Sequence, residues 1–173
     1  MNDTSSFFIE KKALFGSYPT QEIVNDLILK GVYYFVDLTT DYEKNKLLKY
    51  DVGNCKYINF QIRDRHIPEN IERFSFFIIK LSNIINLLDD NQFIYIHCRG
   101  GHGRAGIVVS CLLCYLYKFT SKESLHMTNI FHNDRKIMNE KWRTIGSPQT
   151  ETQKNFVRRL FKPVYIENIH NKN

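Results

Sequence analysis

Short apolar runs alternate along the chain with longer segments in which apolar residues recur every three or four positions. The short runs predict strands, because most of them are rich in β-branched and aromatic residues. They cover residues 13–15, 32–36, 56–60 and 93–96. The last run is apolar at every position, which is typical of a strand in a sheet that is covered on both faces.

The longer segments predict amphipathic helices, since their spacing places apolar side chains on one face. They cover residues 20–30, 70–88, 104–117, 122–131 and 150–161. Strands that alternate with helices favour an α/β fold with a mostly parallel central sheet flanked by helices. No repeat or linker interrupts the pattern, so we expect residues 1–173 to form a single compact domain.

Composition narrows the class of protein. Hydrophobic residues make up 43% of the 173 residues and charged residues 24%, which excludes a disordered chain, a collagen-like repeat and a coiled coil. No apolar run reaches the roughly 20 residues of a membrane span, and no signal peptide is visible. The four cysteines are too unevenly spaced for a disulfide framework, so we expect a cytoplasmic protein. Cys111 and Cys114 fall among apolar residues of one predicted helix, which predicts that both are core residues.

The formal net charge of +6 favours an anionic partner. Two basic groups lie in the middle of the chain: Arg63, Arg65 and His66, then Arg99, His102 and Arg104. We expect them to form a basic rim around one anion-binding pocket. A third group lies on the C-terminal predicted helix and is interpreted as a solvated face; it consists of Lys154, Arg158, Arg159 and Lys162.

The segment between the last predicted strand and the next helix carries the strongest chemical signal. It runs His97-Cys98-Arg99-Gly100-Gly101-His102-Gly103-Arg104. Its glycines allow a tight turn with N–H groups pointing inward, and the helix adds the positive end of its dipole, so the loop suits a phosphate. The same field stabilises a thiolate, and Arg104 can bind two phosphate oxygens through its planar fork. Cys98 is therefore a candidate nucleophile for phosphoryl transfer.

The pattern His-Cys-x5-Arg at 97–104 resembles the signature of the cysteine-based protein tyrosine and dual-specificity phosphatases. The resemblance implies a phosphatase domain that hydrolyses phosphotyrosine through a phosphocysteine, with phosphoserine and phosphothreonine as further candidate substrates. It implies no cofactor and no metal. By this match Cys98 and Arg104 are catalytic, and His97 supports the loop. The substrate-binding residues that the match implies are Arg99, Gly100, Gly101, His102, Gly103 and Ala105.

An upstream segment, 60–68, resembles the loop that carries the general acid of the same family, in which an Asp stands a few residues before a Pro. Asp64 matches that residue. A protonated carboxyl is needed there because a tyrosyl or seryl oxygen leaves poorly as an anion. Two alternatives remain open: Asp64 caps the following helix, or Glu69 is the acid.

A downstream segment, 147–153, resembles the glutamine loop of the tyrosine-specific branch, where a glutamine orients the water that hydrolyses the phosphocysteine. Gln149 takes that catalytic role by match, and Gln153 supports it. The alternative is that this segment only starts a helix and leaves both glutamines solvated.

Ala105 departs from the family pattern, which usually has Ser or Thr directly after the signature arginine. That departure leaves room for a pseudophosphatase that binds phosphoproteins without turnover. A second alternative keeps the chemistry and changes the substrate to a phosphoinositide or an RNA 5′-triphosphate, since Arg99 and His102 occupy loop positions that resemble those of phosphoinositide phosphatases. The expected partner is a phosphorylated protein or peptide, with no stable nucleic acid partner and no transmembrane segment; the oligomeric state is left open.

Overall fold

A computed structural model describes residues 3–162 of the chain. Its sheet has the strand order β1-β2-β5-β3-β4, in which β1 is antiparallel to β2 and the other neighbours are parallel. The strands are β1 (Ser5–Ile9), β2 (Ala13–Gly16), β3 (Val32–Asp37), β4 (Lys56–Asn59) and β5 (Phe93–His97). The predicted α/β class with a mostly parallel sheet is confirmed. The predicted domain also included residues 1–2 and 163–173, which lie outside the described range.

Five of the seven helices within residues 3–162, α1, α3, α4, α5 and α7, match the predicted segments to within about two residues at each end. They are α1 (Gln21–Leu29), α2 (Asp41–Lys44), α3 (Ile71–Leu87), α4 (Arg104–Tyr117), α5 (Ser121–Asn133), α6 (Glu140–Ile145) and α7 (Glu151–Leu160). In this part of the chain no helix is long and apolar enough to cross a membrane.

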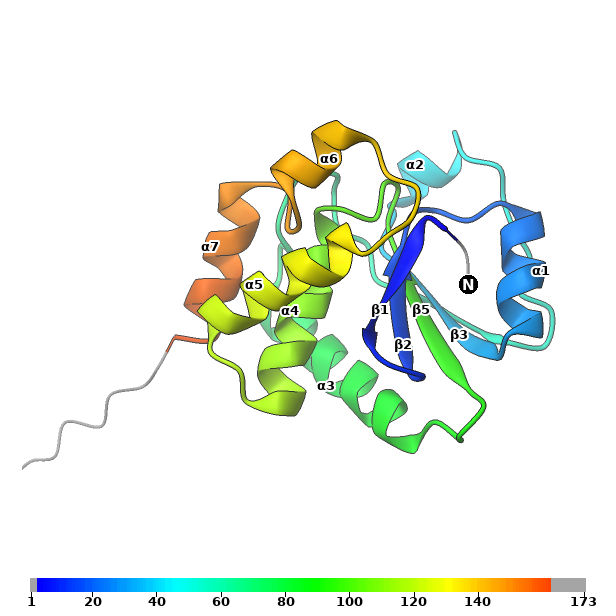
Figure 1. Cartoon of the computed structure of the whole chain (residues 1–173), viewed down its shortest axis with the longest axis horizontal. Helices are drawn as coiled ribbons and strands as arrows, with labels where there is room; N and C mark the ends of the chain where they lie inside the picture. The colour runs from blue at the N-terminus through cyan, green and yellow to red at the C-terminus, as the bar shows by residue number, and fades with distance from the viewer. Residues whose placement is uncertain (1–2, 163–173) are drawn as a thin grey trace, which may run out of the picture.

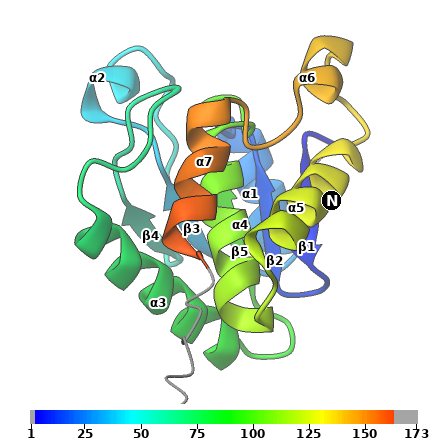
Figure 2. The same ribbon diagram turned by 90° about the vertical axis from the view of Figure 1, so that its left-hand side faces the viewer.

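The sheet is covered on both faces, as the continuous apolar run of β5 predicts. Ile94 and Ile96 belong to the larger hydrophobic cluster, beneath α3, α4 and α7, whereas Tyr95 belongs to the cluster that contains the buried residues of α1. Figure 1 shows α1 on one side of the sheet, and Figure 2 shows α3, α4, α5 and α7 on the other. Cys111 and Cys114 are buried within α4, which confirms that both are core residues.

Three short elements were not predicted: β1, α2 and α6. The two short helices have four and six residues, too few to show a helical period, and they depend on their caps. Thr40 and Glu43 form a capping box at α2, and Asn139 caps α6 through a bond from the Lys141 N–H. Both helices lie at the upper end of the molecule in Figures 1 and 2, on either side of the loop that joins β5 to α4.

Candidate active site

The loop between β5 and α4 folds as the sequence predicts, with Cys98 at its start and Arg104 as the first residue of α4. Cys98 is 2% exposed and Arg104 is 1% exposed. Gly101 has a φ of +75° and packs so closely on the backbone of Gly16 that a Cβ atom would overlap it. The loop therefore needs glycine at this position both for its turn and for its contact with β2.

The Arg104 guanidinium is held on one edge by a carboxylate from α2. Its Nη1 and Nη2 donate to the two carboxylate oxygens of Glu43, at 2.7 and 2.9 Å, and Nη1 also donates to the carbonyl of Ile62 at 3.0 Å. Burial opposes the ionisation of Glu43, but the bonds from Arg104 and Thr40 outweigh it, so the pKa of Glu43 is lowered. The result is a fully formed fork-to-fork ion pair beneath the loop.

Glu43 is a site residue that the sequence did not reveal, since it is 61 positions from Arg104. Its local signal was the pair Thr40 and Glu43, an S/T-x-x-E pattern directly after β3. In the structure the same carboxylate accepts from the Thr40 N–H at 3.1 Å and from Arg104. One side chain thus caps a four-residue helix and fixes the arginine that begins α4.

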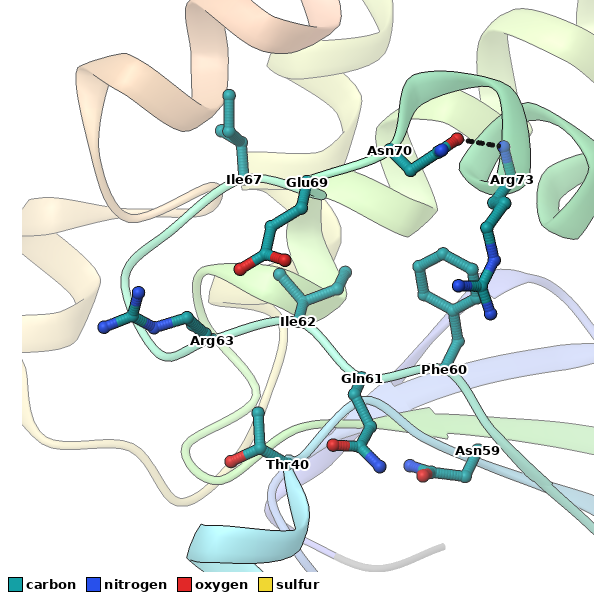
Figure 3. A pocket seen from close by; sticks show the side chains of 10 residues that line it. All are labelled: Thr40, Asn59, Phe60, Gln61, Ile62, Arg63, Ile67, Glu69, Asn70 and Arg73. Atoms are coloured by element: carbon teal, nitrogen blue, oxygen red, sulfur yellow. Dashed lines mark hydrogen bonds between the residues drawn. The ribbon is translucent and has the colours of Figure 1, made fainter.

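Asp64, in the segment that joins β4 to α3, contacts the same guanidinium. Its Oδ1 lies 3.0 Å from Arg104 Nη2, and its side chain is 52% exposed. The alternative that Asp64 caps the next helix is wrong, because the N-cap of α3 is Asn70, whose Oδ1 accepts from the Arg73 N–H. The other candidate acid, Glu69, lines a separate hollow of about 440 Å³, whose walls come mainly from residues 59–63 and 67–73 (Figure 3).

A pocket of about 280 Å³ opens above Cys98. It gathers residues from four segments of the chain, and its lining consists of Asp64, Arg65, Cys98, Arg99, Gly100, His102, Gly103, Trp142 and Gln149. Most of the residues predicted from three separate motifs therefore meet in one place. Trp142, on α6, was not predicted; the signal available was that it is the one tryptophan of the sequence.

Comparison with known proteins agrees with this geometry. Residues 6–157 match the family model described as "Swiss Army Knife protein, DSP-PTPase phosphatase domain". The chain belongs to this phosphatase family. It is 39% identical over 158 residues to "Putative tyrosine phosphatase 067L" of Invertebrate iridescent virus 3, and 43% identical over 160 residues to "Putative tyrosine phosphatase 197R" of Invertebrate iridescent virus 6. The matches cover 91% and 92% of this chain, but 65% and 54% of those relatives.

Solved structures of phosphatases share the fold. The crystal structure of Tk-PTP in the active form superposes with a TM-score of 0.73 at 19% identity, over 95% of this chain and 100% of that one. Kinase associated phosphatase superposes with a TM-score of 0.66 at 19% identity, over 85% and 84% of the two chains. These likenesses confirm the protein tyrosine phosphatase-like fold.

Of the two glutamines that resemble the family's glutamine loop, Gln149 lines the pocket and Gln153 does not. Gln153 is fully buried, and its Nε2 donates to the carbonyl of His66 at 3.1 Å while its Oε1 accepts from the Thr150 N–H. The alternative of two solvated glutamines is wrong for Gln153. This side chain ties the start of α7 to the segment that carries Asp64.

His102 lies in the pocket wall as a neutral ring. It stacks on Trp142 with 4.5 Å between ring centroids, and its Nδ1 is 2.8 Å from Nε2 of His132. Burial, with the charge of Arg135, lowers the pKa of His102 to about 4. The expected basic rim is therefore wrong at this position, and also at Arg63, which lines the separate hollow, and at His66, which is not part of the lining. The positive groups that line the pocket are Arg65 and Arg99.

His97 and Ala105 lie behind the loop, away from solvent. His97 is fully buried, its Nε2 is 2.6 Å from the Tyr50 hydroxyl, and burial lowers its pKa to about 4, so the ring is neutral. Ala105 is fully buried in the first turn of α4. Within residues 3–162, no cluster of three or more His, Cys, Asp or Glu side chains is suited to a metal ion.

Proposed function

We propose that this chain hydrolyses phosphotyrosine in proteins through a phosphocysteine formed on Cys98. Arg104 binds the phosphoryl oxygens, Asp64 is the general acid, and Gln149 positions the hydrolytic water. The family membership and the names of the viral relatives support a phosphatase of the tyrosine and dual-specificity type. Phosphoserine and phosphothreonine are secondary candidates, consistent with a DSP-type domain.

The observation that carries this proposal is the way in which the two edges of the Arg104 guanidinium are occupied. Glu43 occupies the Nη1–Nη2 edge. On the other edge the buried Nε–H has no hydrogen-bond partner among the described residues, and Nη2 meets Asp64. A phosphate that takes the place of the Asp64 carboxylate on Nη2 can accept from Nε and Nη2 through two oxygens in the same plane. A phosphoryl oxygen on Nη2 would then lie beside Asp64, where the leaving oxygen needs a proton.

The reaction follows in two balanced steps. In the first, the Cys98 thiolate attacks phosphorus, the bond from phosphorus to the tyrosyl oxygen breaks, and that oxygen takes the proton of Asp64. In the second, the Asp64 carboxylate takes a proton from a water held by Gln149, the water oxygen bonds to phosphorus, and the thiolate leaves. The products are the free hydroxyl and inorganic phosphate, and Arg104 stabilises the charge on the phosphoryl oxygens in both steps.

The pocket wall favours an aromatic phosphate ester with acidic neighbours over an inositol polyphosphate. Trp142 and the neutral His102 give it an aromatic side, while Arg65 and Arg99 add positive charge at the rim. The alternative of a phosphoinositide substrate depends on positive charge at both Arg99 and His102. Because the pKa of His102 is lowered, its ring carries no positive charge at neutral pH.

Trapping of the intermediate tests the proposal. The full chain is mixed with a radiolabelled phosphotyrosine peptide, an inositol phospholipid or an RNA with a 5′-triphosphate, and the reaction is quenched in acid. We expect label on the Cys98 peptide with the phosphotyrosine substrate, loss of label in Cys98→Ser, and full label in Cys55→Ser as the matched control. Peptide binding without turnover would identify a pseudophosphatase, and turnover of the lipid or the RNA but not the peptide would overturn the substrate class.

A separate prediction concerns Glu43, whose carboxylate fixes the phosphate-binding arginine. Glu43→Gln keeps the shape of the side chain but removes one charge-assisted bond, so we expect kcat/KM for an aryl phosphate to fall by about tenfold. Glu72→Gln, on the exposed face of α3, is the control and should leave kcat/KM unchanged. Equal kinetics for the two variants would mean that the loop backbone holds Arg104 without Glu43.

A further inference from the structure

An arginine is buried beneath the phosphate-binding loop without an acidic partner. Arg135 is 2% exposed, and its Nη2 donates to the carbonyls of Gly101 at 3.0 Å and Phe15 at 3.3 Å. Its guanidinium carbon lies 4.4 Å from the centre of the Phe15 ring. Among the described residues no Asp or Glu forms an ion pair with it, and its Nε–H has no hydrogen-bond partner. A buried cation without a counter-charge carries a desolvation penalty of several kcal/mol.

The position of Arg135 is fixed by a second arginine. Arg143, on α6, donates from Nη2 to the carbonyl of Arg135 at 2.7 Å and from Nη1 to the carbonyl of Asn133 at 2.6 Å. These bonds tie the backbone around Arg135 to α6, and the Arg135 side chain reaches the loop from there. Burial lowers the pKa of Arg135 to about 10, so the side chain remains a cation at neutral pH. The fold thus keeps the positive charge of Arg135 buried under the loop, although its desolvation is unfavourable.

The acidic groups that oppose this lowering of the Arg135 pKa are the hydroxyl of Tyr95 and the thiol of Cys98. Tyr95 cannot supply the missing anion, because burial raises its pKa and its hydroxyl donates to the carbonyl of Ser17 at 2.6 Å. Of the two groups, Cys98 is the one that the proposed mechanism needs as an anion. The nearby histidines, His97, His102 and His132, are neutral, since burial lowers the pKa of each to about 4 or below.

The charges around Arg104 explain why a second cation is needed. Its single positive charge contacts two carboxylates, Glu43 and Asp64. The three groups are neutral overall when Asp64 carries the proton that the proposed first step uses, and they carry a net negative charge when Asp64 is ionised. Arg104 therefore leaves no net positive charge for the thiolate in either state, and in the second state the cluster opposes the thiolate by like charge. The helix dipole and the loop N–H groups offset part of this, and a buried cation on the opposite side of the loop offsets more.

We propose that Arg135 is a positioning residue that supplies the counter-charge of the Cys98 thiolate from beneath the loop and holds the Gly101 carbonyl away from the pocket. This inference rests on the proposed function, because it assigns Arg135 a role in preparing the same nucleophile. It predicts a ligand-independent effect on the thiol, which a purely structural role would not produce.

The pH dependence of alkylation tests it. The rate of reaction of Cys98 with iodoacetamide, a neutral reagent, is measured from pH 4 to 9 in the wild type, Arg135→Lys, Arg135→Gln and the exposed-cation control Arg158→Gln. Loss of the charge in Arg135→Gln should move the midpoint upward by about one pH unit, which is a roughly tenfold slower reaction at pH values below both midpoints. Arg135→Lys and Arg158→Gln should keep the wild-type midpoint. An unchanged midpoint in folded Arg135→Gln overturns the inference.

A thermal-unfolding cycle tests the inference even if Arg135→Gln does not fold with Cys98, because an unfolding transition that appears only in the Cys98→Ser background supports the inference and its absence in both backgrounds overturns it. Arg135→Lys and Arg135→Gln are each made with Cys98 and with Cys98→Ser, and the Tm values are compared at pH 7. If Arg135 serves the thiolate, its replacement by Gln should lower the Tm less in the Cys98→Ser background, where no thiolate forms. Equal losses in both backgrounds would show a purely structural role. A wild-type Cys98 that does not react at pH 6 would instead overturn the proposed nucleophile, and this inference with it.

Discussion

Asp64→Asn is expected to lower kcat for a phosphotyrosine peptide by about 10²-fold or more. An unassisted tyrosyl oxygen must leave as an anion, and asparagine has no acidic proton to give it. The position of Asp64 supports this role, because its carboxylate lies 3.0 Å from Arg104 Nη2 and lines the pocket above Cys98. Phosphate bound on the Nε–Nη2 edge of Arg104 would bring the leaving oxygen next to it.

The measurement compares two substrates. An aryl phosphate with an acidic phenol leaves without protonation, so its kcat should fall far less in Asp64→Asn than that of the peptide. Glu69→Gln is the matched control, since Glu69 lines the hollow formed mainly by residues 59–63 and 67–73 and does not line the Cys98 pocket (Figure 3). Equal losses for both substrates, or a larger loss in Glu69→Gln, would remove Asp64 from the role.

Ala105→Ser is expected to raise kcat, because dephosphorylation of the enzyme expels the Cys98 thiolate without help from a hydroxyl. Ala105 is fully buried in the first turn of α4, and its methyl group cannot donate a hydrogen bond to Cys98 Sγ. A hydrogen bond to a charged group contributes about 1.5–3 kcal/mol, which corresponds to roughly 10–150-fold in the rate of the second step. Phosphocysteine hydrolysis should therefore limit turnover in the wild type.

Rapid mixing with an aryl phosphate checks this expectation. The wild type should release a burst of phenol close to one equivalent before the slower steady state, and the burst should shrink as kcat rises in Ala105→Ser and Ala105→Thr. Ala13→Ser, which places a hydroxyl at another fully buried alanine at the far end of β2, is the control and should not raise kcat. Absence of a burst with unchanged kcat would mean that another donor already serves the sulfur.

The sequence by itself determined the parts of this protein that are encoded locally. The strand, the glycine-rich loop and the helix that follow one another at 93–117 give the position of Cys98 and Arg104, because eight consecutive residues contain both the turn and its chemistry. The alternation of apolar runs and helical spacing also gave the mostly parallel sheet. In each case the signal lies in the spacing of neighbouring residues, which requires no knowledge of distant contacts.

Tertiary structure decided which distant side chains complete the site and what charge they carry. Glu43 reaches Arg104 across 61 positions, and Arg135 reaches Gly101 across 34 and Phe15 across 120. The helices α2 and α6 that bring in Glu43 and Trp142 are too short to show a period. The neutral state of His102 follows from burial beside Arg135, and burial is a property of the packed chain. Such charges and contacts depend on the packing of segments far apart in sequence, so no local pattern of residues could predict them.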